Sequence, residues 1–418
     1  MRYILSVICF FVMSVASQAT DYYVCGTGSD AASGLTGAPW LTYDKGMTEL
    51  SAMSGGDTLS FCLGFTETST NSNTLTSSGT CTGASPCIVD SYDAGGSGVP
   101  QITNTTNDVL TLDGDILEDG GYTFNNIHFV GDNSVDCIAI NDGFSNVTFA
   151  STVEFEGCEK GVDIEVVEDE VSTNIDIEAT FTDITGTGIE GSASYSEWKV
   201  QMTGVGNTAT TDHAIHLQGI NTRSLTISTG KITNTAAVST VCSSPIIYGN
   251  GSFKGLYIDH LHLKETEDTA ASNCIGILLD GDFGAEAASF NYVSLYRPTF
   301  EYMGGIGFAC NDCTNVTIDA PQFIGDDALT TGIKIPYSTD TADYVDIYKA
   351  KFVMRDSVAG RKAMDIDVVH GSIDRNHMIL NDAVDLCYEA NSSVTISNNV
   401  CMYATSSELE DSTNWTVN

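Results

Sequence analysis

Basic side chains that could hold an anionic ligand recur at fixed places in a chain that is otherwise strongly acidic. Lys and Arg total 16 against 55 Asp and Glu, which gives a net charge of −39. Even so, Lys349 and Lys351 lie two and four residues after the apolar residue Ile347. The same two places after comparable apolar residues hold further basic side chains: Lys231, His260, His262, Arg297, Arg375 and His377. This basic row predicts a substrate-binding surface for a polyanion, which the rest of the chain would repel.

A solvated bend whose charges pair with one another is the alternative explanation of this row. Asp259, Asp319 and Asp374 each directly follow the apolar residue of their repeat, so each lies just before the first of the two places of the row. Their ion pairs would leave a nearly neutral band, so both interpretations stay open.

A second set of residues has the composition of a proton-transfer site or a calcium site. If the isoleucines of GIKI (332–335) point into a core, Lys334 points outward, and Asp365 and Asp367 do so one repeat later. We predict that these three residues are catalytic, with the lysine as the base. Two Asp on one strand and a third on the next could also bind Ca²⁺ through hard oxygen ligands, and the predicted set is Asp365, Asp367 and Asp385. A plain surface ion pair is the alternative, because neighbouring carboxylates raise the pKa of a lysine and a base needs it lowered.

One further histidine and one further carboxylate are predicted to lie on the same sheet as Lys334, further back along the chain. They are His216, in AIHL (214–217), and Asp280, after GILL (276–279). They extend the possible proton-transfer surface beyond the three predicted catalytic residues.

An alternative catalytic pair occurs in FIGDDAL (323–329), where Asp326 and Asp327 follow a glycine. Paired carboxylates are suited to cleaving a glycosidic bond by hydrolysis. An Asp-Asp sequence in a loop is also common in ordinary turns.

The cysteines predict disulfides. There are 13, of which Cys9 lies in the N-terminal leader, so an even number is left. Their spacing favours local pairs: Cys81–Cys87, Cys137–Cys158, Cys242–Cys274 and Cys387–Cys401. Cys310 and Cys313 form a CxxC motif, for which zinc or redox chemistry is the alternative to a disulfide.

A repeat of short strands must position all of these residues. Apolar alternations such as SLTI (224–227), NVTI (315–318) and YVDI (344–347) recur at steps of 23 to 37 residues. A second apolar position follows each by five residues, and a third strand such as GIKI or AMDI (363–366) comes later in each unit. Three short strands per unit, without a helix, predict an all-β fold: a right-handed parallel β-helix of about ten or more coils.

The predicted organisation has four parts. Residues 1–19 form a signal peptide, and residues 20–115 form an N-terminal cap with the first irregular coils. Residues 116–404 form the regular parallel β-helix, and residues 405–418 form a C-terminal tail. A helix at about 43–53 is predicted to cap the open end of the solenoid.

The start of the mature chain, DYYVCGTGSDAASGLTGAPWLTYDKGMTELSAMSGGDTLSFCLG (21–64), resembles the opening of the pectate-lyase-like superfamily of secreted β-helix proteins. SPCIVDSY and VPQIT, between residues 78 and 103, resemble the next segment of that superfamily. The resemblance implies a polysaccharide lyase that cleaves an acidic polysaccharide by β-elimination, with calcium as an expected cofactor. The alternative is a non-catalytic surface, adhesive or glycan-binding β-helix.

The leader and the charge indicate the compartment and the partners. Residues 1–19 combine an early Arg, a short apolar run and a small-residue end, so we expect a secreted, extracellular or periplasmic protein. We expect no nucleic acid and no membrane among the partners, because the acidic surface repels both nucleic acid and anionic lipid.

Overall fold

The fold is described by a computed structural model of the chain. It describes residues 19–76, 80–114, 120–141, 143–165, 172–205, 212–219, 222–234, 245–265, 275–280, 290–301, 303–325, 329–336, 343–354, 361–380, 386–390 and 394–403. The other residues include most of the predicted signal peptide and the C-terminal tail, and the predicted division between residues 115 and 116 stays a prediction.

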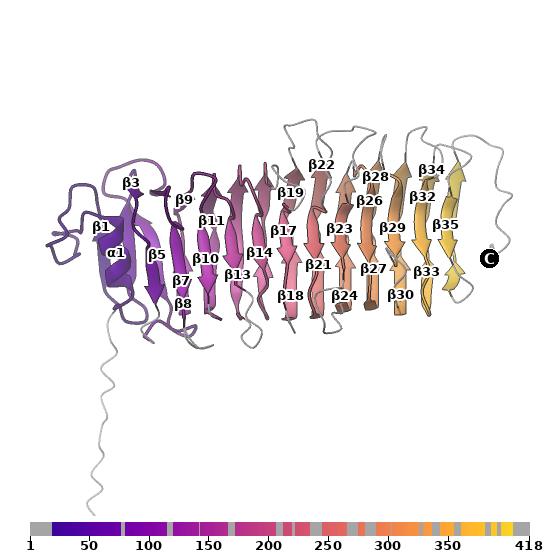
Figure 1. Ribbon diagram of the computed structural model, residues 1–418, viewed down its shortest axis with the longest axis horizontal. Helices are drawn as coiled ribbons and strands as arrows, with labels where there is room; N and C mark the ends of the chain where they lie inside the picture. Colours follow the sequence, from indigo (N-terminus) through magenta and orange to yellow (C-terminus); the bar gives the residue numbers. More distant parts are fainter. Residues whose placement is uncertain are drawn as a thin grey trace, which may run out of the picture.

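The chain winds as a right-handed parallel β-helix, and the stacked strands are seen side-on in Figure 1. In a typical coil, β17 (Ile215–Leu217) is followed by β18 (Thr222–Ser228) and β19 (Lys231–Asn234). Each strand then pairs in parallel with the equivalent strand of the next coil. The predicted all-β fold class is confirmed.

The first strand of each coil belongs to a 12-stranded parallel sheet. Besides β17, its strands are β4 (Thr74–Thr76), β7 (Leu110–Asp113), β10 (Ile138–Asn141), β12 (Val162–Ile164), β14 (Ile189–Gly191), β20 (Ile247–Gly249), β23 (Ile275–Leu279), β26 (Ile306–Cys310), β29 (Thr331–Ile335), β32 (Lys362–Ile366) and β35 (Leu386–Ala390).

The second and third strands of the coils form a 25-stranded sheet. Besides β18 and β19, its strands are β1 (Asp21–Val24), β2 (Thr58–Cys62), β3 (Thr66–Ser69), β5 (Cys87–Tyr92), β6 (Gln101–Asn104), β8 (Gly120–Phe124), β9 (His128–Val130), β11 (Ser145–Glu156), β13 (Ile175–Thr182), β15 (Glu197–Trp198), β16 (Gln201–Thr203), β21 (Phe253–Asp259), β22 (His262–Glu265), β24 (Phe290–Tyr296), β25 (Thr299–Glu301), β27 (Cys313–Asp319), β28 (Gln322–Gly325), β30 (Asp343–Tyr348), β31 (Lys351–Met354), β33 (Gly371–Asp374), β34 (His377–Leu380), β36 (Val394–Ser397) and β37 (Val400–Tyr403).

The core consists of like residues stacked from coil to coil. Phe300, Phe323 and Phe352 are buried, and their ring centroids lie 4.7 and 4.6 Å apart with nearly parallel planes. These distances equal the spacing between neighbouring strands, as expected when the repeat of the sequence becomes the repeat of the coil.

One repeat position differs from its sequence-based prediction. The alternation around residues 198–200 suggests Val200 as the residue that stacks on Ile177. In the structure, Trp198 pairs in register with Ile177 and with Ile227, and its indole is buried. The indole nitrogen donates a hydrogen bond to the carbonyl oxygen of Ile175, so the larger side chain can occupy the core place.

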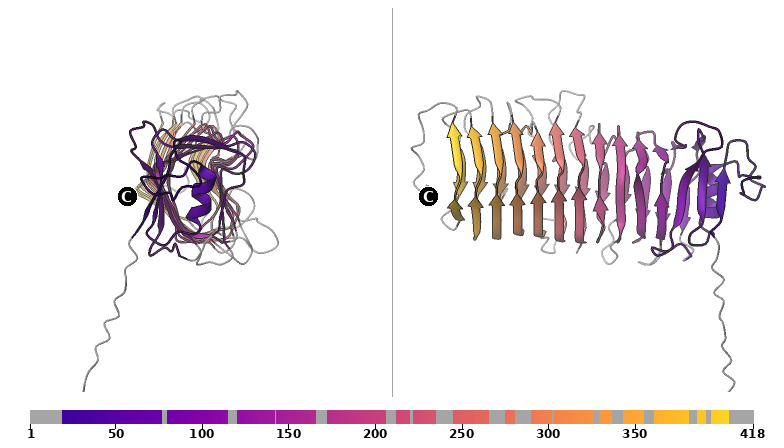
Figure 2. Two further views of the ribbon diagram at one scale, coloured as in Figure 1. Left: turned by 90° about the vertical axis from the view of Figure 1, so that its left-hand side faces the viewer. Right: turned by 180° about the vertical axis from the view of Figure 1, so that it is seen from behind.

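Helix α1 (Tyr43–Leu50) caps the N-terminal end of the solenoid, as predicted, and Figure 2 shows it across that end. Thr42 caps the helix by accepting a hydrogen bond from the backbone nitrogen of Lys45. Tyr43, Met47 and Leu50 are buried against the first coils. The helix therefore removes an apolar end from water.

Five disulfides join cysteines of the described residues. Three predicted pairs are present, namely Cys81–Cys87, Cys137–Cys158 and Cys387–Cys401. Cys310 and Cys313 are joined as well, and a fifth bond, Cys25–Cys62, links the first strand to the second. The predicted pair Cys242–Cys274 lies outside the described residues.

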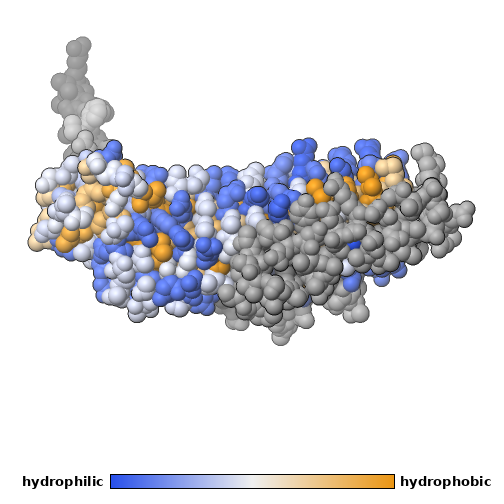
Figure 3. Space-filling model, turned by 90° about the horizontal axis from the view of Figure 1, so that it is seen from above, coloured by the Kyte–Doolittle hydropathy of each residue, from blue (hydrophilic) through white to orange (hydrophobic). Residues whose placement is uncertain are grey.

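The described residues on one face of the solenoid mix hydrophilic and apolar surface. Polar and charged residues predominate on the face shown in Figure 3, and apolar residues form smaller patches among them. Within the described part of the chain, no helix is long and apolar enough to cross a membrane.

Candidate functional site

The outer face of the 12-stranded sheet carries one column of side chains that includes several charged residues. Side chains alternate along each strand, so the residue between two core residues points away from the core. Strand register aligns the following residues along the axis: Ala139, Asp163, Glu190, His216, Tyr248, Leu278, Ala309, Lys334, Asp365 and Glu389.

The predicted catalytic residues Lys334 and Asp365 are neighbours in this column. Asp365 also accepts a hydrogen bond from Lys362, with Nζ 3.1 Å from Oδ2. Lys362 contacts Glu389 on the next coil at 2.5 Å. The hydrogen bond to Glu389 raises the pKa of Lys362, so this lysine remains a cation.

The predicted calcium ligands are only partly assembled. Asp367 lies exposed two residues after Asp365. Glu389, and not Asp385, is the register partner of Asp365, and Asp385 itself lies outside the described residues. Across the described ranges, no group of three or more metal-ligating side chains is found. The predicted calcium site, one of whose three ligands lies outside the described residues, therefore stays a prediction.

The alternative catalytic pair, Asp326 and Asp327, lies outside the described residues. The structure says nothing about its geometry.

The predicted basic row lies on the 25-stranded sheet, a different sheet from the one that holds Lys334. Its members form two columns. Lys231 and His262 are register partners, and so are Lys351 and His377, with Thr299 and Gln322 between the two pairs. The other column occupies the bend before these strands, where the backbone has positive φ at His260, Arg297, Lys349 and Arg375.

Half of the residues in this row contact neighbouring carboxylates. Lys349 pairs with Asp319 at 3.1 Å, and Arg375 pairs with Asp374 at 3.3 Å. The contacts of the histidines with acidic partners are His260–Asp259 at 2.6 Å and His262–Glu301 at 2.8 Å. The alternative explanation, a self-paired bend, accounts for these four residues.

A more compact charged cluster lies at the other end of the outer column. Lys160, just before β12, has its Nζ 2.7 Å from Asp163 Oδ2 and 2.9 Å from Glu190 Oε2. The two carboxylates belong to neighbouring coils, and one lysine bridges them.

His216 and Gln218 extend this cluster. Gln218 Nε2 donates to Glu190 Oε1 and to His216 Nδ1, both at 2.9 Å. The imidazole of His216 stacks on the ring of Tyr248, with centroids 5.2 Å apart. His213 packs edge-on to His216 and hydrogen-bonds through Nδ1 to the carbonyl oxygen of Pro245.

The environment shifts the pKa values of these groups in opposite directions. Burial raises the pKa of Asp163, although Lys160 opposes it. Contacts with His216 and Lys160 lower the pKa of Glu190 to about 2. Burial lowers the pKa of Lys160, but hydrogen bonds to Asp163 and Glu190 outweigh it and raise the value. Asp163 therefore takes up a proton more readily than a free carboxyl group, and Glu190 less readily.

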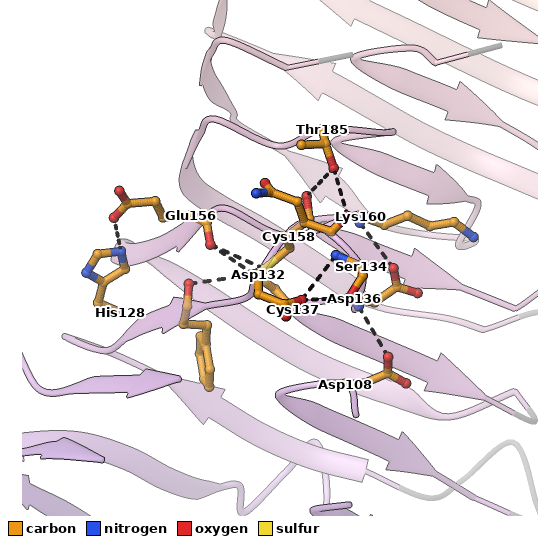
Figure 4. The surroundings of a disulfide bond; sticks show 12 residues. Asp108, His128, Asp132, Ser134, Asp136, Cys137, Glu156, Cys158, Lys160 and Thr185 are labelled. Carbon is orange, nitrogen blue, oxygen red and sulfur yellow. Dashed lines mark hydrogen bonds and ion pairs between the residues drawn. A yellow bond between two sulfur atoms is a disulfide. The ribbon is translucent and has the colours of Figure 1, made fainter. Parts of the chain in front are cut away.

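A further carboxyl, Asp136, lies on the neighbouring coil next to the Cys137–Cys158 disulfide, and Figure 4 shows it with Lys160 and Asp108. Its Oδ1 accepts a hydrogen bond from the backbone nitrogen of Lys160 at 3.1 Å. Burial and the nearby charge of Asp163 raise the pKa of Asp136 to about 7.

The cluster borders an open cavity of about 370 Å³ on the outer face of the sheet. The lining residues are Asn141, Asp163, Ile164, Glu165, Glu190 and Gln218. Titratable groups with shifted pKa values beside a cavity are typical of a catalytic centre. We name Lys160, Asp163, Glu190, His216 and Gln218 the acid–base cluster.

Only part of this cluster could be predicted from the sequence. His216 was predicted on the correct sheet, and Asp163 is the outward residue of GVDI (161–164), which has the same alternation as the strand of Lys334. Glu190 gave no comparable signal, because its strand has three residues and ends in Gly191. Lys160 precedes its strand, so alternation does not place it.

Comparison of the sequence with protein-family models and with curated proteins finds no match. Among solved structures, a mannuronic acid-specific polysaccharide family 6 lyase from human gut microbiota aligns with a TM-score of 0.50 and 10% identity, over 94% of this chain and 89% of its own. A rhamnogalacturonan lyase aligns with a TM-score of 0.46 and 10% identity, over 94% of this chain and 90% of the lyase chain. Tailspike protein 3 of bacteriophage CBA120 aligns with a TM-score of 0.46 and 12% identity, over 93% of this chain and 62% of the tailspike chain.

At such low identity, the likeness concerns the fold. The chain has the parallel β-helix fold that its N-terminal resemblance to the pectate-lyase-like superfamily predicted.

Proposed function

We propose that the protein is a carbohydrate-active enzyme that cleaves a polysaccharide at the acid–base cluster. The observation that carries this proposal is the pair of carboxylates bridged by Lys160, with a raised pKa at Asp163 and a lowered pKa at Glu190. Both line the cavity on the outer face of the 12-stranded sheet.

The two carboxyl groups are suited to glycoside hydrolysis. In this proposal Asp163 acts as the general acid, because burial makes its carboxyl easier to protonate: once protonated, it donates that proton to the glycosidic oxygen, and the bond from that oxygen to the anomeric carbon breaks. Ionised Glu190 stabilises the positive charge that develops on the sugar. Water then bonds to the anomeric carbon, and its proton returns to Asp163.

The charge of the cluster indicates the kind of glycan. Three of the six residues that line the cavity are acidic, and Lys160 is already bound to two carboxylates. A neutral polysaccharide therefore fits this cavity better than an acidic one, since like charges in a partly buried site repel strongly.

The test is a screen of neutral glucans, xylans and mannans together with alginate, pectate and glycosaminoglycans. New reducing ends would report any cleavage, and ultraviolet absorbance would report the unsaturated sugars made only by β-elimination. We expect reducing ends without absorbance. Asp163→Asn and Glu190→Gln should each slow cleavage by about 100-fold or more, the usual contribution of an acid–base group.

Lys334→Ala provides the matched control, because Lys334 lies in the same outward column three coils beyond Tyr248. Its activity should stay near that of the unchanged protein. Binding without cleavage on every polysaccharide would contradict the proposal and favour the non-catalytic glycan-binding alternative.

A second candidate function is β-elimination of an acidic polysaccharide with Lys334 as the base. It is favoured by the outward position of Lys334 on the same face of the sheet, whereas its neighbour Asp365 counts against it by favouring the charged form of the lysine. The lysine would take the proton next to the sugar carboxylate, the electrons would form a carbon–carbon double bond, and the glycosidic bond would break. Ultraviolet absorbance that disappears in Lys334→Ala, but persists in Glu190→Gln, would establish this candidate instead.

We further propose that the protein acts outside the cytoplasm. The apolar leader and the five disulfides of the described residues support export, because disulfides persist in oxidising compartments. Cleavage of a large polysaccharide, which does not cross a cell membrane, would also require an external enzyme.

A further inference from the structure

One bend of the solenoid holds its residue in the left-handed backbone conformation on successive coils. This bend lies in the first residues of the second strand of the coil or directly before them. The positions with positive φ are Asn146, Asn174, Tyr195, Ser224, Gly255, Tyr292, Asn315 and Tyr344. Asn and Gly adopt this conformation most readily. Asn174 and Asn146 are also joined by a side-chain hydrogen bond of 3.0 Å.

Three tyrosines at this bend have no evident role in stability. Tyr195, Tyr292 and Tyr344 have φ of 57°, 61° and 55°, which disfavours a bulky side chain by about 1 kcal/mol or more. Their side chains are 56%, 59% and 55% exposed, so burial offsets little of that strain. Asn occupies the same place on other coils without this disadvantage. Strained positions that stability does not explain are candidates for function.

Two more rings continue the line of these tyrosines. At Gly255, a Cβ would lie 3.2 Å from Cε2 of Tyr257, so the exposed ring of Tyr257 covers this bend. His370, on the coil after Tyr344, stacks on its ring with centroids 4.9 Å apart and planes 13° apart. We name Tyr195, Tyr257, Tyr292, Tyr344 and His370 the aromatic ridge.

The spacing of the ridge follows the rise of the coil. Tyr292 and Tyr344 are separated by the coil of Asn315, which places them two rises, or about 10 Å, apart along the axis. That distance is close to the length of two sugar rings in an extended polysaccharide.

Hydrogen-bond donors lie beside the ridge. Arg223 and Lys254 precede the bend on neighbouring coils, are register partners and are exposed. Asn291 and Thr314 continue the same row. The bend directly follows the 12-stranded sheet in each coil: Tyr248 of the outward column and Gly255 of the bend are seven residues apart in one coil. The ridge therefore runs parallel to the outward column that holds the acid–base cluster.

We propose that the aromatic ridge binds an extended polysaccharide chain that runs along the axis of the solenoid. The inference rests on the proposed function for its class of ligand. Tyrosine offers an apolar ring for the C–H face of a sugar and a hydroxyl for its polar groups. Arg223 and Lys254 can donate hydrogen bonds to sugar oxygens. The ridge holds a long chain beside the cluster and adds affinity that a short oligosaccharide cannot use.

The test replaces the three strained tyrosines with the residue found on neighbouring coils. In a Glu190→Gln background, in which we expect cleavage to be slowed about 100-fold or more, Tyr195→Asn/Tyr292→Asn/Tyr344→Asn should weaken retention on the polysaccharide found in the screen by at least tenfold. If none is cleaved, the same panel of polysaccharides serves as the probe. The melting temperature of the triple variant should be equal or higher, because Asn relieves the backbone strain. Tyr296→Asn is the control, since Tyr296 is exposed on the same sheet but lies at the other end of its strand.

The outcomes separate this inference from the proposed function. Unchanged retention in the triple variant would overturn the ridge, whether or not the enzyme cleaves the polysaccharide. Ridge-dependent retention without any cleavage would support the ridge and overturn the proposed hydrolysis. A change in molecular mass in solution, with retention unchanged, would show that the ridge binds a second copy of the chain and overturn its role in glycan binding.

Discussion

At the scale of single residues, the acid–base cluster separates neighbouring carboxyl groups by environment. Asp136 and Asp163 are partly buried and retain protons more readily, whereas Glu190 contacts His216 and Lys160 and loses its proton. Burial penalises the charged form, and nearby cations favour it. Burial at Asp163, and the contacts of Glu190 with His216 and Lys160, therefore produce carboxyl groups with opposite shifts in proton affinity on adjacent coils.

The raised pKa of Asp136 predicts a stability that depends on pH. The folded state keeps this proton up to a pKa of about 7, whereas the unfolded chain releases it near 3.8. Between these values the folded state binds more protons, so the free energy of unfolding falls as pH rises. Asp136→Asn removes the titrating group, so the free energy of unfolding no longer falls with pH on its account. The variant keeps the Oδ1 atom that accepts a hydrogen bond from the backbone nitrogen of Lys160. Relative to the unchanged protein, we expect the variant to gain about 2 kcal/mol between pH 4 and pH 8, after allowance for solvent screening.

Chemical denaturation at a series of pH values measures this difference. His213 acts in the opposite direction, since burial lowers its pKa to about 4 and its contribution to stability rises with pH up to about 6.5. The contribution of His213 is the same in the unchanged protein and in Asp136→Asn, so it cancels when the two are compared. A difference that does not depend on pH would show that Asp136 is an ordinary carboxylate.

At the scale of the elements, the core could be predicted from the sequence, but the site could only be predicted in part. Ile227, Ile258 and Leu295 repeat as apolar residues because each must stack on the last, and the observed register agrees. Residues that point outward do not have to stack on an equivalent residue of the next coil. Residue types such as those of Glu190 and Lys160 therefore do not recur at the repeat period of the sequence. The contact between Glu190 and Lys160 also depends on the length of the bends between strands. The same dependence is seen at Asp365, whose register partner is Glu389 and not the predicted Asp385.

The Cys137–Cys158 disulfide joins the segments that carry Asp136 and Lys160, and it should support both stability and activity. Its cysteines are 21 residues apart and lie in consecutive coils. Cys137→Ala/Cys158→Ala should lower the free energy of unfolding by about 3 kcal/mol, because the bond restricts the unfolded chain. Cleavage should slow as well, since the two segments then move independently.

Cys310→Ala/Cys313→Ala is the matched control for the disulfide. This bond spans only three residues and lies several coils from the cluster, so its loss should affect stability less and leave cleavage almost unchanged. Denaturation and the reducing-end assay measure both quantities. Equal losses of activity in the two double variants would argue against a specific role for Cys137–Cys158.

At the scale of the whole molecule, the net charge of −39 acts on an elongated solenoid (Figure 1). Stacking the coils brings acidic side chains from distant parts of the chain to within one strand spacing. The resulting repulsion opposes the folded state. Local ion pairs such as Lys349–Asp319 relieve only part of it, because the chain has far fewer cations than carboxylates.

Salt should therefore stabilise the protein. Raising NaCl from about 0.01 M to about 1 M shortens the screening length from about 30 Å to about 3 Å, so repulsion between coils is largely removed. We expect the melting temperature to rise by several degrees, measured by calorimetry at constant pH. A melting temperature that falls with salt would mean that ion pairs outweigh the repulsion.

The same measurement tests the predicted calcium site, because screening depends on ionic strength and binding depends on the ion. At equal ionic strength, CaCl2 and MgCl2 screen alike, whereas carboxylates that hold calcium favour it through larger and more flexible coordination. If Asp365, Asp367 and Asp385 bind calcium, CaCl2 should raise the melting temperature beyond MgCl2. That excess should disappear in Asp365→Asn/Asp367→Asn and persist in Asp163→Asn, which removes one carboxylate from the same outer column. Equal melting temperatures in the two salts would contradict a calcium site at these residues and leave charge screening as the sole effect of the cation.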